Sequence, residues 1–415
     1  MTELEKQGAG AKEAARVLAV ASTAVKNAAL EAIAAGLLAG QDAILAANAQ
    51  DMDAARAGGM AQAMLDRLAL TPARIAGMAD GVRQVAALPD PIGVVDRRVE
   101  RPNGLVIERR RVPLGVIAII FEARPNVTSD AAALCLKSGN AVILRGGKEA
   151  AHSCRAIADV MRRAVASAGL PENCINLVAD TSRESAAELM RLRDYVNVLI
   201  PRGGAGLIRA TVENARVPVI ETGVGNCHVY VDGAADLQMA ADIIYNAKCS
   251  RPSVCNAAET LLVDRRVAQA FLPMAKARLD EKHTQLRGCP ETRAILGDCV
   301  VPATEADYAS EFGDYILAVK VVSGLDEALA HIAKYSTGHS ECIVTEDRAA
   351  AEKFMDNVDA AAVYHNASTR FTDGGEFGLG AEIGISTQKL HARGPMGLEQ
   401  LTSVKYTAYG TGQVR

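Results

Sequence analysis

Residues 1–90 carry the pattern of amphipathic helices, with apolar side chains recurring at every third or fourth position in an Ala-rich background. The clearest run comprises Val17, Leu18, Val20, Ala21, Ala24 and Val25. Proline lacks the backbone donor that a helix needs, so Pro89 and Pro91 mark the end of this section. We therefore predict a helical N-terminal section.

Strand-like segments follow these prolines. Two β-prone runs, 94–101 and 105–111, flank Pro102, Asn103 and Gly104. An Asn-Gly pair between two such runs predicts a β-hairpin. The many charged residues on both arms favour a hairpin that projects from the body of the protein. It is either a solvated surface hairpin or an arm that pairs with another subunit.

Short β-branched runs then alternate with helical stretches. Up to residue 231 the predicted strands are 116–121, 141–144, 175–178, 196–200 and 217–220, with helices such as 129–137 and 150–168 between them. A second series has predicted strands at 257–263, 316–322, 341–344 and 361–364, and a β-prone run at 403–407. Such alternation predicts βαβ units and mostly parallel sheets covered by helices.

Composition narrows the class of protein. The 415 residues suit two or three domains, at about 100–200 residues each. Apolar residues make up 49% and charged residues 23%, which excludes a mostly disordered chain. Because 45 Lys and Arg face 49 Asp and Glu, the net charge of −4 predicts no nucleic-acid partner and no membrane-binding surface.

The nine cysteines and the N-terminus indicate a reducing compartment. No two cysteines have C-x-x-C spacing, so we predict neither a metal site nor a disulfide framework. The acidic N-terminal residues lack the pattern of a signal peptide, and the apolar stretch 114–121 is too short to span a bilayer. We predict a cytoplasmic protein.

Two glycine turns follow predicted strands and precede helices. The first contains Arg145, two glycines and Lys148, and the second contains Arg202, Gly203 and Gly204. Free amides at a helix N-terminus favour anions, so both turns are candidates for binding phosphate groups. The alternative is an ordinary turn beside a solvated arginine, and the glycine fingerprints of Rossmann folds and P-loops are missing.

One cysteine stands out as a candidate nucleophile. Cys255 lies in a polar, turn-forming loop between a predicted helix at 238–248 and the strand that begins near residue 257, with Arg251 close by. Cations and polar flanks stabilise a thiolate. The alternative is a buried structural cysteine, which is our interpretation of the other eight.

The residues around Cys255 and three other stretches resemble the gamma-glutamyl phosphate reductases, a branch of the aldehyde dehydrogenase superfamily. Residues 254–263 read Val-Cys-Asn-Ala-Ala-Glu-Thr-Leu-Leu-Val after Arg251 and Pro252, and 391–398 read His-Ala-Arg-Gly-Pro-Met-Gly-Leu. The stretches 121–128 and 136–147 are similar to the same enzymes. The resemblance covers essentially the whole chain.

This resemblance implies an α/β fold of the aldehyde dehydrogenase type. It implies a Rossmann-type NADP-binding domain over 1–93 and 113–223, and an α/β catalytic domain with a cysteine nucleophile over 224–385. A small β oligomerisation element would comprise 94–112 and 386–415.

The resemblance also assigns cofactor residues. Arg145 corresponds to a lysine that contacts the adenosine ribose, and Glu311 to a glutamate that holds the nicotinamide ribose. Lys148 stands where NAD-preferring members often hold a glutamate, so a cation there favours the 2′-phosphate of NADP(H). Gly203 and Gly204 join the expected cofactor site because they form the second candidate turn for phosphate described above, and not through the resemblance.

Catalytic and substrate residues are implied in the same way. Cys255 is the nucleophile, and its backbone N–H is expected to stabilise the oxyanion. Glu221, 34 residues before it, matches the superfamily's glutamate, either as a base or as a positioning residue. A match to the superfamily motif without gaps puts Glu122 at the position whose side chain binds the oxyanion. A short shift of the match puts Asn126 at that position.

The implied substrate carries a phosphate and needs cations. Arg124 and Arg251 are the candidates for the departing phosphate, and Asn256 is expected to contact the substrate. The implied activity is NADPH-dependent reduction of L-glutamyl 5-phosphate to L-glutamate 5-semialdehyde through a cysteine thioacyl intermediate, in proline biosynthesis. A homo-oligomer is expected, with association with glutamate 5-kinase as a further partner.

Two alternatives stay open. A CoA-acylating or hydrolytic aldehyde dehydrogenase would use the same cysteine with another acyl donor or with water. A non-catalytic binding protein could have kept the fold and lost the reaction.

Overall fold

The computed structural model describes the backbone of residues 1–415 and every side chain except that of Ala63. The chain forms two compact units. Unit 1 comprises Met1–Thr222, Gly378–Gly384 and Met396–Arg415, and unit 2 comprises Gly223–Phe377 and Ile385–Pro395. The two units are described separately below.

Unit 1 begins with five helices, which confirms the predicted helical section. They are α1 (Glu3–Leu18), α2 (Thr23–Ala39), α3 (Gln41–Ala57), α4 (Gln62–Leu68) and α5 (Pro72–Ala87). The run from Val17 to Val25 is not one helical face, because α1 ends first and the Ser22 hydroxyl then accepts a hydrogen bond from the Val25 N–H to cap α2. Val17 and Val20 are exposed.

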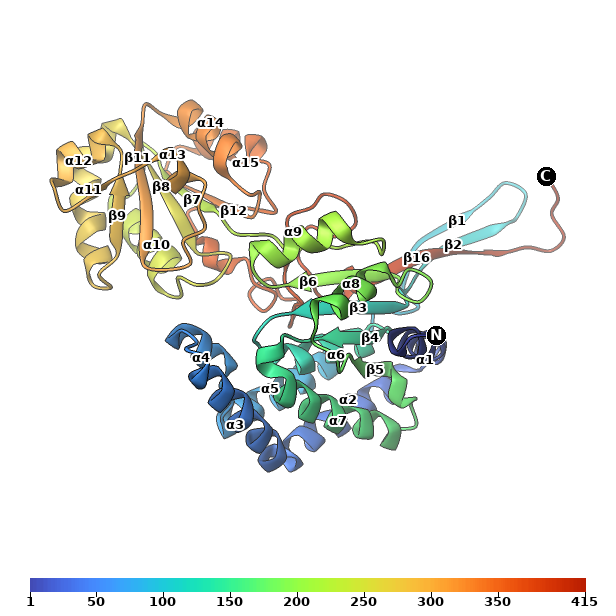
Figure 1. Ribbon diagram of the computed structural model, residues 1–415. Coiled ribbons are helices and arrows are strands. Elements are labelled where there is room, and N and C mark those ends of the chain that lie inside the picture. Colours follow the sequence, from blue (N-terminus) through green and yellow to red (C-terminus); the bar gives the residue numbers. More distant parts are fainter. The chain divides into compact units, whose positions relative to one another are not determined.

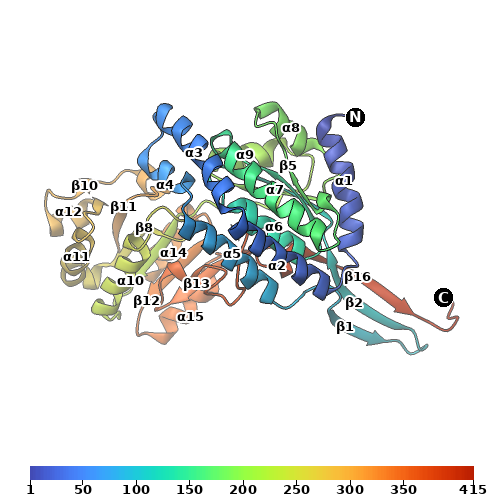
Figure 2. The same ribbon diagram turned by 90° about the horizontal axis from the view of Figure 1, so that it is seen from below.

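A parallel four-stranded sheet forms the centre of unit 1, in the order β5-β4-β3-β6. Its strands are β3 (Val116–Phe121), β4 (Ala141–Arg145), β5 (Ile175–Leu177) and β6 (Val198–Arg202). Helices α6 (Val127–Lys137) and α7 (Ala151–Ser167) cover one face, and α8 (Arg183–Arg191) and α9 (Ala205–Asn214) cover the other (Figures 1 and 2). Every residue of β3 is buried, as a two-sided cover requires.

The predicted strand at 217–220 is wrong. Only one bridge forms there, between Val219 and Leu199 of β6. Pro218 has no N–H to donate, and the contact with β6 consists of the hydrogen bonds from Leu199 N to Pro218 O and from Ile220 N to Leu199 O. This segment therefore lies beside the sheet without extending it.

Unit 2 holds a parallel seven-stranded sheet in the order β10-β9-β11-β8-β7-β12-β13. Its strands are β7 (Cys227–Val231), β8 (Ala258–Asp264), β9 (Gln285–Gly288), β10 (Val301–Pro302), β11 (Ile316–Val322), β12 (Ser340–Val344) and β13 (Ala362–His365). Its helices are α10 (Leu237–Cys249), α11 (Arg265–Asp280), α12 (Pro290–Leu296), α13 (Glu305–Tyr308), α14 (Leu325–Tyr335) and α15 (Arg348–Asn357). The prediction missed β7, β9 and β10.

Alternate residues of these strands feed two separate hydrophobic cores. Val229 and Val231 of β7 pack on the side of α10 and α11, whereas Tyr230 between them packs on the side of α14 and α15. Leu261 and Leu262 of β8 divide in the same way. A sheet that is covered on both faces explains why its strands are apolar without interruption.

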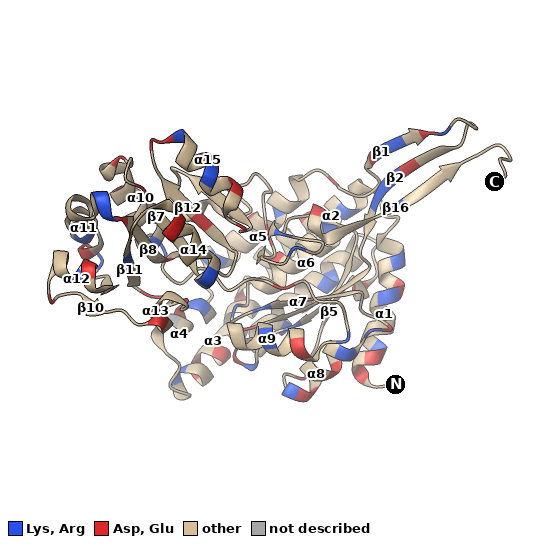
Figure 3. Ribbon diagram, turned by 90° about the horizontal axis from the view of Figure 1, so that it is seen from above, with Lys and Arg blue, Asp and Glu red and all other residues tan. Residues whose placement is uncertain are grey.

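The predicted hairpin is confirmed and belongs to unit 1. Strand β1 (Val95–Glu100) pairs with β2 (Val106–Pro113), and Gly104 adopts a φ of +82° in the turn. The C-terminal β16 (Thr402–Tyr409) pairs with β2, so the three strands form one projecting sheet (Figure 1). Charges of both signs line it (Figure 3), and Arg109 and Asp96 form an ion pair of 2.8 Å across β1 and β2.

Short elements complete the fold. Strands β14 (Ile385–Ser386) and β15 (Gly394–Pro395) pair within unit 2, and the 3₁₀ turns are η1 (Lys148–Ala150), η2 (Glu172–Cys174), η3 (Thr369–Phe371) and η4 (Glu399–Leu401). Segment 386–415, predicted as part of one oligomerisation element, is thus divided between the units. No single described helix is long and apolar enough to cross a membrane, although the bent pair of α2 and α3 together meets the criteria of length and composition.

Candidate active site

A buried ion pair closes the base of the loop that carries Cys255. This loop, residues 250–256, connects α10 to β8. The Nζ of Lys248 at the end of α10 lies 2.6 Å from a carboxylate oxygen of Glu259 at the start of β8, and both side chains are fully buried. Burial raises the pKa of Glu259 to about 7, and the charge of Lys248 opposes that rise. The two ends of the loop are therefore fixed to each other.

Residues at the start of β7 and just before it contact the backbone of Cys255. A Cβ atom on Gly225 would lie only 1.5 Å from the carbonyl oxygen of Cys255, so no other residue fits there. The same carbonyl accepts a hydrogen bond from the Cys227 thiol at 3.2 Å. Burial raises the pKa of Cys227, so this thiol keeps the proton that it donates. Glu311 accepts from the N–H of Gly225 at 3.1 Å, which anchors the glycine.

Asn256 connects the loop to the segment around η3. Its Nδ2 donates to the carbonyl oxygens of Arg370 and Thr372 at 3.2 and 3.0 Å, and its own carbonyl accepts from the Thr369 hydroxyl at 2.7 Å. Asn256 is only 4% exposed. Its amide is thus used within the protein, and the substrate contact expected of it stays a prediction.

Arg370 is a charged residue of this site that the sequence analysis missed. It donates from Nη1 to Asn256 Oδ1 and from Nε to the Ser250 hydroxyl, 3.1 Å away, so it contacts both ends of the loop. Burial lowers the pKa of Arg370, and the positive charge of Arg251 lowers it further. Its position shortly after β13 was the available signal, because ligands gather beyond the carboxyl ends of parallel strands.

In unit 1 the first glycine turn separates its two cations. Arg145 ends β4, and its Nη2 donates to the carbonyl oxygens of Thr181 and Ser182 at 2.6 and 2.8 Å. Burial lowers the pKa of this guanidinium. Lys148, which begins η1, is exposed. Arg145 therefore holds a neighbouring loop in this structure, and the ribose contact expected of it stays a prediction.

The second glycine turn presents an amide that already binds an anion. Gly204 is the N-cap of α9, and its N–H donates to the carboxylate of Glu122 at 3.0 Å. A Cβ on Gly203 would lie 2.7 Å from that carboxyl group, so the glycine gives Glu122 its space. A carboxylate at the N-terminus of a helix is stabilised by the helix dipole.

The remaining candidates also lie in unit 1. Asn126 precedes α6, and its Nδ2 donates to Asp130 at 2.9 Å. Burial raises the pKa of Asp130 to about 6, although this hydrogen bond opposes the rise. Arg124 is exposed, and Glu221 is half-buried in an irregular segment just before Gly223. The structure thus groups Arg251, Cys255, Asn256 and Glu311 in unit 2 and places the other candidates in unit 1.

Comparisons with known proteins identify the family of this chain. The model of the aldehyde dehydrogenase family matches residues 2–292. A curated gamma-glutamyl phosphate reductase of Heliobacterium modesticaldum is 61% identical over 414 residues, which covers 100% of this chain and 99% of the relative. A crystal structure of gamma-glutamyl phosphate reductase from Thermotoga maritima has a TM-score of 0.98 and 50% identity, with 100% of both chains covered. The chain belongs to the gamma-glutamyl phosphate reductase family.

More distant structures share the fold with this family member. The acetylating aldehyde dehydrogenase of Geobacillus thermoglucosidasius has a TM-score of 0.72 at 19% identity, covering 100% of this chain and 97% of that chain. The predicted α/β fold of the aldehyde dehydrogenase type is therefore confirmed. The membership also makes the chain an oxidoreductase.

Cys255 is less buried than most of the other cysteines of this chain. Six are buried (Cys135, Cys154, Cys174, Cys227, Cys249 and Cys342). Burial raises the pKa of Cys154, Cys174 and Cys342 to about 12, which keeps these thiols protonated and unreactive. Cys255 and Cys289 are partly exposed, and Cys299 is exposed. A labelling experiment on Cys255 must therefore account for both Cys289 and Cys299.

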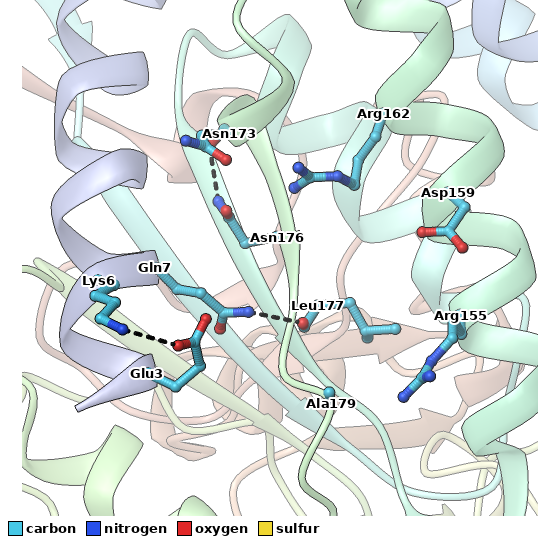
Figure 4. A pocket seen from close by; sticks show the side chains of 10 residues that line it. All are labelled: Glu3, Lys6, Gln7, Arg155, Asp159, Arg162, Asn173, Asn176, Leu177 and Ala179. Carbon is cyan, nitrogen blue, oxygen red and sulfur yellow. Dashed lines mark hydrogen bonds and ion pairs between the residues drawn. The ribbon is translucent and has the colours of Figure 1, made fainter.

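A polar pocket of about 410 Å³ opens at the free edge of β5, between α1 and α7 (Figure 4). Lys6, Arg155 and Arg162 bring positive charge to it, and Glu3 and Asp159 bring negative charge. The residues that line it include none of the predicted site residues. A second, smaller hollow shares Arg155, Leu177 and Ala179 with this pocket and is also lined by Gly146 and Gly147 of the first glycine turn.

Proposed function

We propose that this chain reduces L-glutamyl 5-phosphate with NADPH, giving L-glutamate 5-semialdehyde and phosphate, the second step of proline biosynthesis from glutamate. One observation carries the proposal. The loop of Cys255 is held on three sides, as a nucleophile requires, in a chain 61% identical over its full length to relatives named gamma-glutamyl phosphate reductase.

The Cys255 thiolate attacks the carbonyl carbon of the acyl phosphate. A C–S bond forms, the C–O bond breaks, and phosphate leaves with the electron pair, which gives a thioester on Cys255. Bound NADPH supplies the hydride whose two electrons reduce the thioester carbon. The C–S bond then breaks, the aldehyde is released, and the thiolate is restored. The one proton that the overall reaction consumes ends on the phosphate.

The residues of unit 1 fit a phosphorylated cofactor. The N–H of Gly204 already holds the Glu122 carboxylate at 3.0 Å, so this helix N-terminus accepts an anion. Lys148 is exposed beside the other glycine turn, where it can meet a 2′-phosphate. These features support NADP(H), with Gly203, Gly204, Arg145 and Lys148 in unit 1 and Glu311 in unit 2 as its residues.

The other site residues keep their proposed roles. The backbone N–H of Cys255 stabilises the oxyanion, and Asn126 is the candidate side-chain donor, because a carboxylate such as that of Glu122 accepts hydrogen bonds and does not donate them. Glu221 acts as a positioning residue, because transfer from an acyl phosphate to a thiol needs no activated water.

The projecting sheet supports a homo-oligomer. Strand β16 is an edge strand, and its Tyr406 and Tyr409 side chains are 68% and 51% exposed. Exposed apolar side chains on an edge strand favour pairing with another chain. The molar mass in solution, measured by light scattering before and after removal of residues 402–415, tests this assignment.

The reverse reaction tests the activity. L-Glutamate 5-semialdehyde, inorganic phosphate and NADP are mixed, and reduced nicotinamide is followed by absorbance. We expect reduction that requires phosphate, prefers NADP to NAD and is lost in Cys255→Ala. Reduction that proceeds equally without phosphate contradicts the proposal and identifies a hydrolytic dehydrogenase, with Glu221 as the base. Reduction that requires coenzyme A identifies an acylating one.

A further inference from the structure

Arg370 has hydrogen-bonding capacity that the protein does not use. A guanidinium carries five N–H donors. Arg370 uses one on the Ser250 hydroxyl and one on Asn256 Oδ1. The other donors meet no acceptor among the described residues. The two bonds that it makes are to residues that bracket the Cys255 loop, so the orientation of its free edge is set by that loop.

A second arginine lies beside it without a carboxylate partner. Arg251 is exposed and forms no ion pair with any described residue. Its charge adds to burial in lowering the pKa of Arg370, while Asp373 and Cys255 act in the opposite direction. The Asp373 carboxylate accepts from the N–H of Gly375 at 2.9 Å and forms no ion pair with Arg370. Two neighbouring guanidinium groups repel each other unless an anion joins them.

The geometry points to Arg370, together with Arg251, as the binding site for the phosphoryl group of the substrate, next to Cys255. This inference rests on the proposed function and adds a catalytic residue to it. In an acyl phosphate a single bridging oxygen separates the carbon that sulfur attacks from the phosphorus. A group that binds the phosphoryl oxygens must therefore lie beside the nucleophile, as Arg370 does.

The two arginines divide the task. When the C–O bond breaks, its electron pair moves onto the departing phosphate, and the N–H groups of Arg370 bind that growing charge more tightly than the substrate. Arg370 is oriented by Ser250 and Asn256, so it supplies a fixed direction. Arg251 is exposed and supplies mainly charge. We therefore expect a larger effect from the loss of Arg370.

The test measures phosphate dependence in the reverse reaction for Arg370→Gln, Arg370→Lys and Arg251→Gln. We expect Arg370→Gln to raise the KM for inorganic phosphate at least about tenfold, while the KM for the semialdehyde changes less than about threefold, because only phosphate loses charge-assisted hydrogen bonds. Arg370→Lys keeps the positive charge but loses the paired N–H donors of the guanidinium. Its KM for inorganic phosphate should therefore lie between the values of the parent protein and Arg370→Gln. Guanidinium ion added to Arg370→Gln should restore part of the rate.

A readout without turnover separates binding from folding. Inorganic phosphate should slow the alkylation of Cys255 by iodoacetamide, followed by mass spectrometry on the peptide that carries Cys255 so that Cys289 and Cys299 do not contribute. This protection should be lost in Arg370→Gln. Arg348→Gln, an exposed arginine of α15 in the same unit, serves as the control and should behave as the parent protein. Circular dichroism checks that each variant is folded.

Two results would overturn the inference, and they are distinguishable. If the parent protein needs phosphate and folded Arg370 variants lose kcat without any change in the KM for phosphate or in protection, Arg370 only braces the loop. If the parent protein itself shows no phosphate dependence, the proposed function is wrong, and the assignment of Arg370 and Arg251 as a phosphoryl-binding site is wrong with it.

Discussion

The loop of Cys255 and the glycine turns of unit 1 hold their functional groups in opposite ways. The ion pair of Lys248 and Glu259 joins the two ends of the loop, and the Cys227 thiol donates a hydrogen bond to the Cys255 carbonyl. Asn256, within the loop, donates to the Thr372 carbonyl. These partners are buried. In the turns, by contrast, Lys148 is exposed, and a carboxylate side chain provides the partner of the Gly204 amide.

The difference follows from what each region does under the proposed function. A nucleophile must stand at one distance from the carbon that it attacks, and a misplacement of about 1 Å can cost about a hundredfold in rate. A cofactor enters and leaves in every turnover, so the groups that bind it must be satisfied at low cost when it is absent. Rigid bracing suits the first task, and a replaceable partner such as Glu122 suits the second.

The same substitution in the two regions tests this contrast most strongly. In Gly225→Ala the new methyl group would overlap the Cys255 carbonyl, at 1.5 Å, so the loop must move. We expect kcat to fall by about a hundredfold or more. In Gly204→Ala the nearest atom outside its own segment is a Glu122 oxygen at 3.9 Å, and φ is −71°, so alanine fits. The rate should fall by less than about fivefold.

Steady-state kinetics and thermal unfolding of both variants give the answer. Gly81→Ala, in α5 with nothing within 4 Å of its added Cβ, is the control for the substitution itself. It should keep full activity and gain about 0.5–1 kcal/mol in the free energy of unfolding, since alanine favours a helix. Equal losses at Gly225 and Gly204 would remove the distinction between the two regions.

The contrast also explains what sequence could and could not predict. The predicted strands at 116–121 and 316–322 have the observed bounds of β3 and β11, because buried parallel strands are continuous apolar runs. The predicted strand at 196–200 lies two residues early, since β6 extends to the less apolar Pro201 and Arg202. Local pattern therefore predicts the sheet of unit 1 and the strands β8, β11, β12 and β13 of unit 2, but it missed β7, β9 and β10.

The bracing of Cys255 could not be predicted in this way. Asn256 and Thr372 are 116 positions apart in the sequence, and their hydrogen bond exists only because β8 and β13 belong to one folded sheet. Resemblance located Cys255 and Asn256 but gave the latter a substrate contact, whereas the structure shows it bonded to its own chain. Cys227 has no local signature, and the one signal for Arg370 is its position shortly after β13.

Removal of the Asn256 amide should produce the next largest effect. In Asn256→Ala the carbonyl groups of Arg370 and Thr372 lose their donor, at a cost of about 1–3 kcal/mol for a buried group left unsatisfied. We expect a loss of about 2 kcal/mol in stability by urea unfolding and about a thirtyfold loss of kcat.

Asn214→Ala controls for the loss of an asparagine, because that exposed side chain donates only to a carbonyl within its own helix. A fully stable Asn256→Ala with a raised KM for substrate would instead support the substrate contact expected from sequence.

Reversal of the charge at Lys148 should change cofactor choice and leave the nucleophile unaffected. In Lys148→Glu we expect kcat/KM for NADPH to fall about tenfold or more, since a charge-assisted contact to a 2′-phosphate is replaced by repulsion. The value for NADH should change less than about threefold, and iodoacetamide should label Cys255 at the parent rate.

Arg163→Glu, an exposed arginine on α7, makes the same change of charge elsewhere in unit 1 and should alter neither cofactor. An equal loss for both cofactors in Lys148→Glu would mean that Lys148 does not recognise the 2′-phosphate.

The smallest expected effect concerns the replaceable partner itself. Glu122 places a negative charge at the N-terminus of α9, and that charge must leave the Gly204 amide before a cofactor phosphate can bind there. Glu122→Gln keeps an oxygen that accepts from the amide but removes the charge, so the Kd of NADPH should fall about threefold, the worth of one charge at a helix N-terminus.

Glu184→Gln removes an exposed carboxylate from the first turn of α8 and should leave the Kd unchanged. Fluorescence titration of NADPH measures all three proteins. Weaker binding by Glu122→Gln would show that Glu122 does more than occupy the amide, and the glycine turn would then resemble the braced loop more closely than its exposed position suggests.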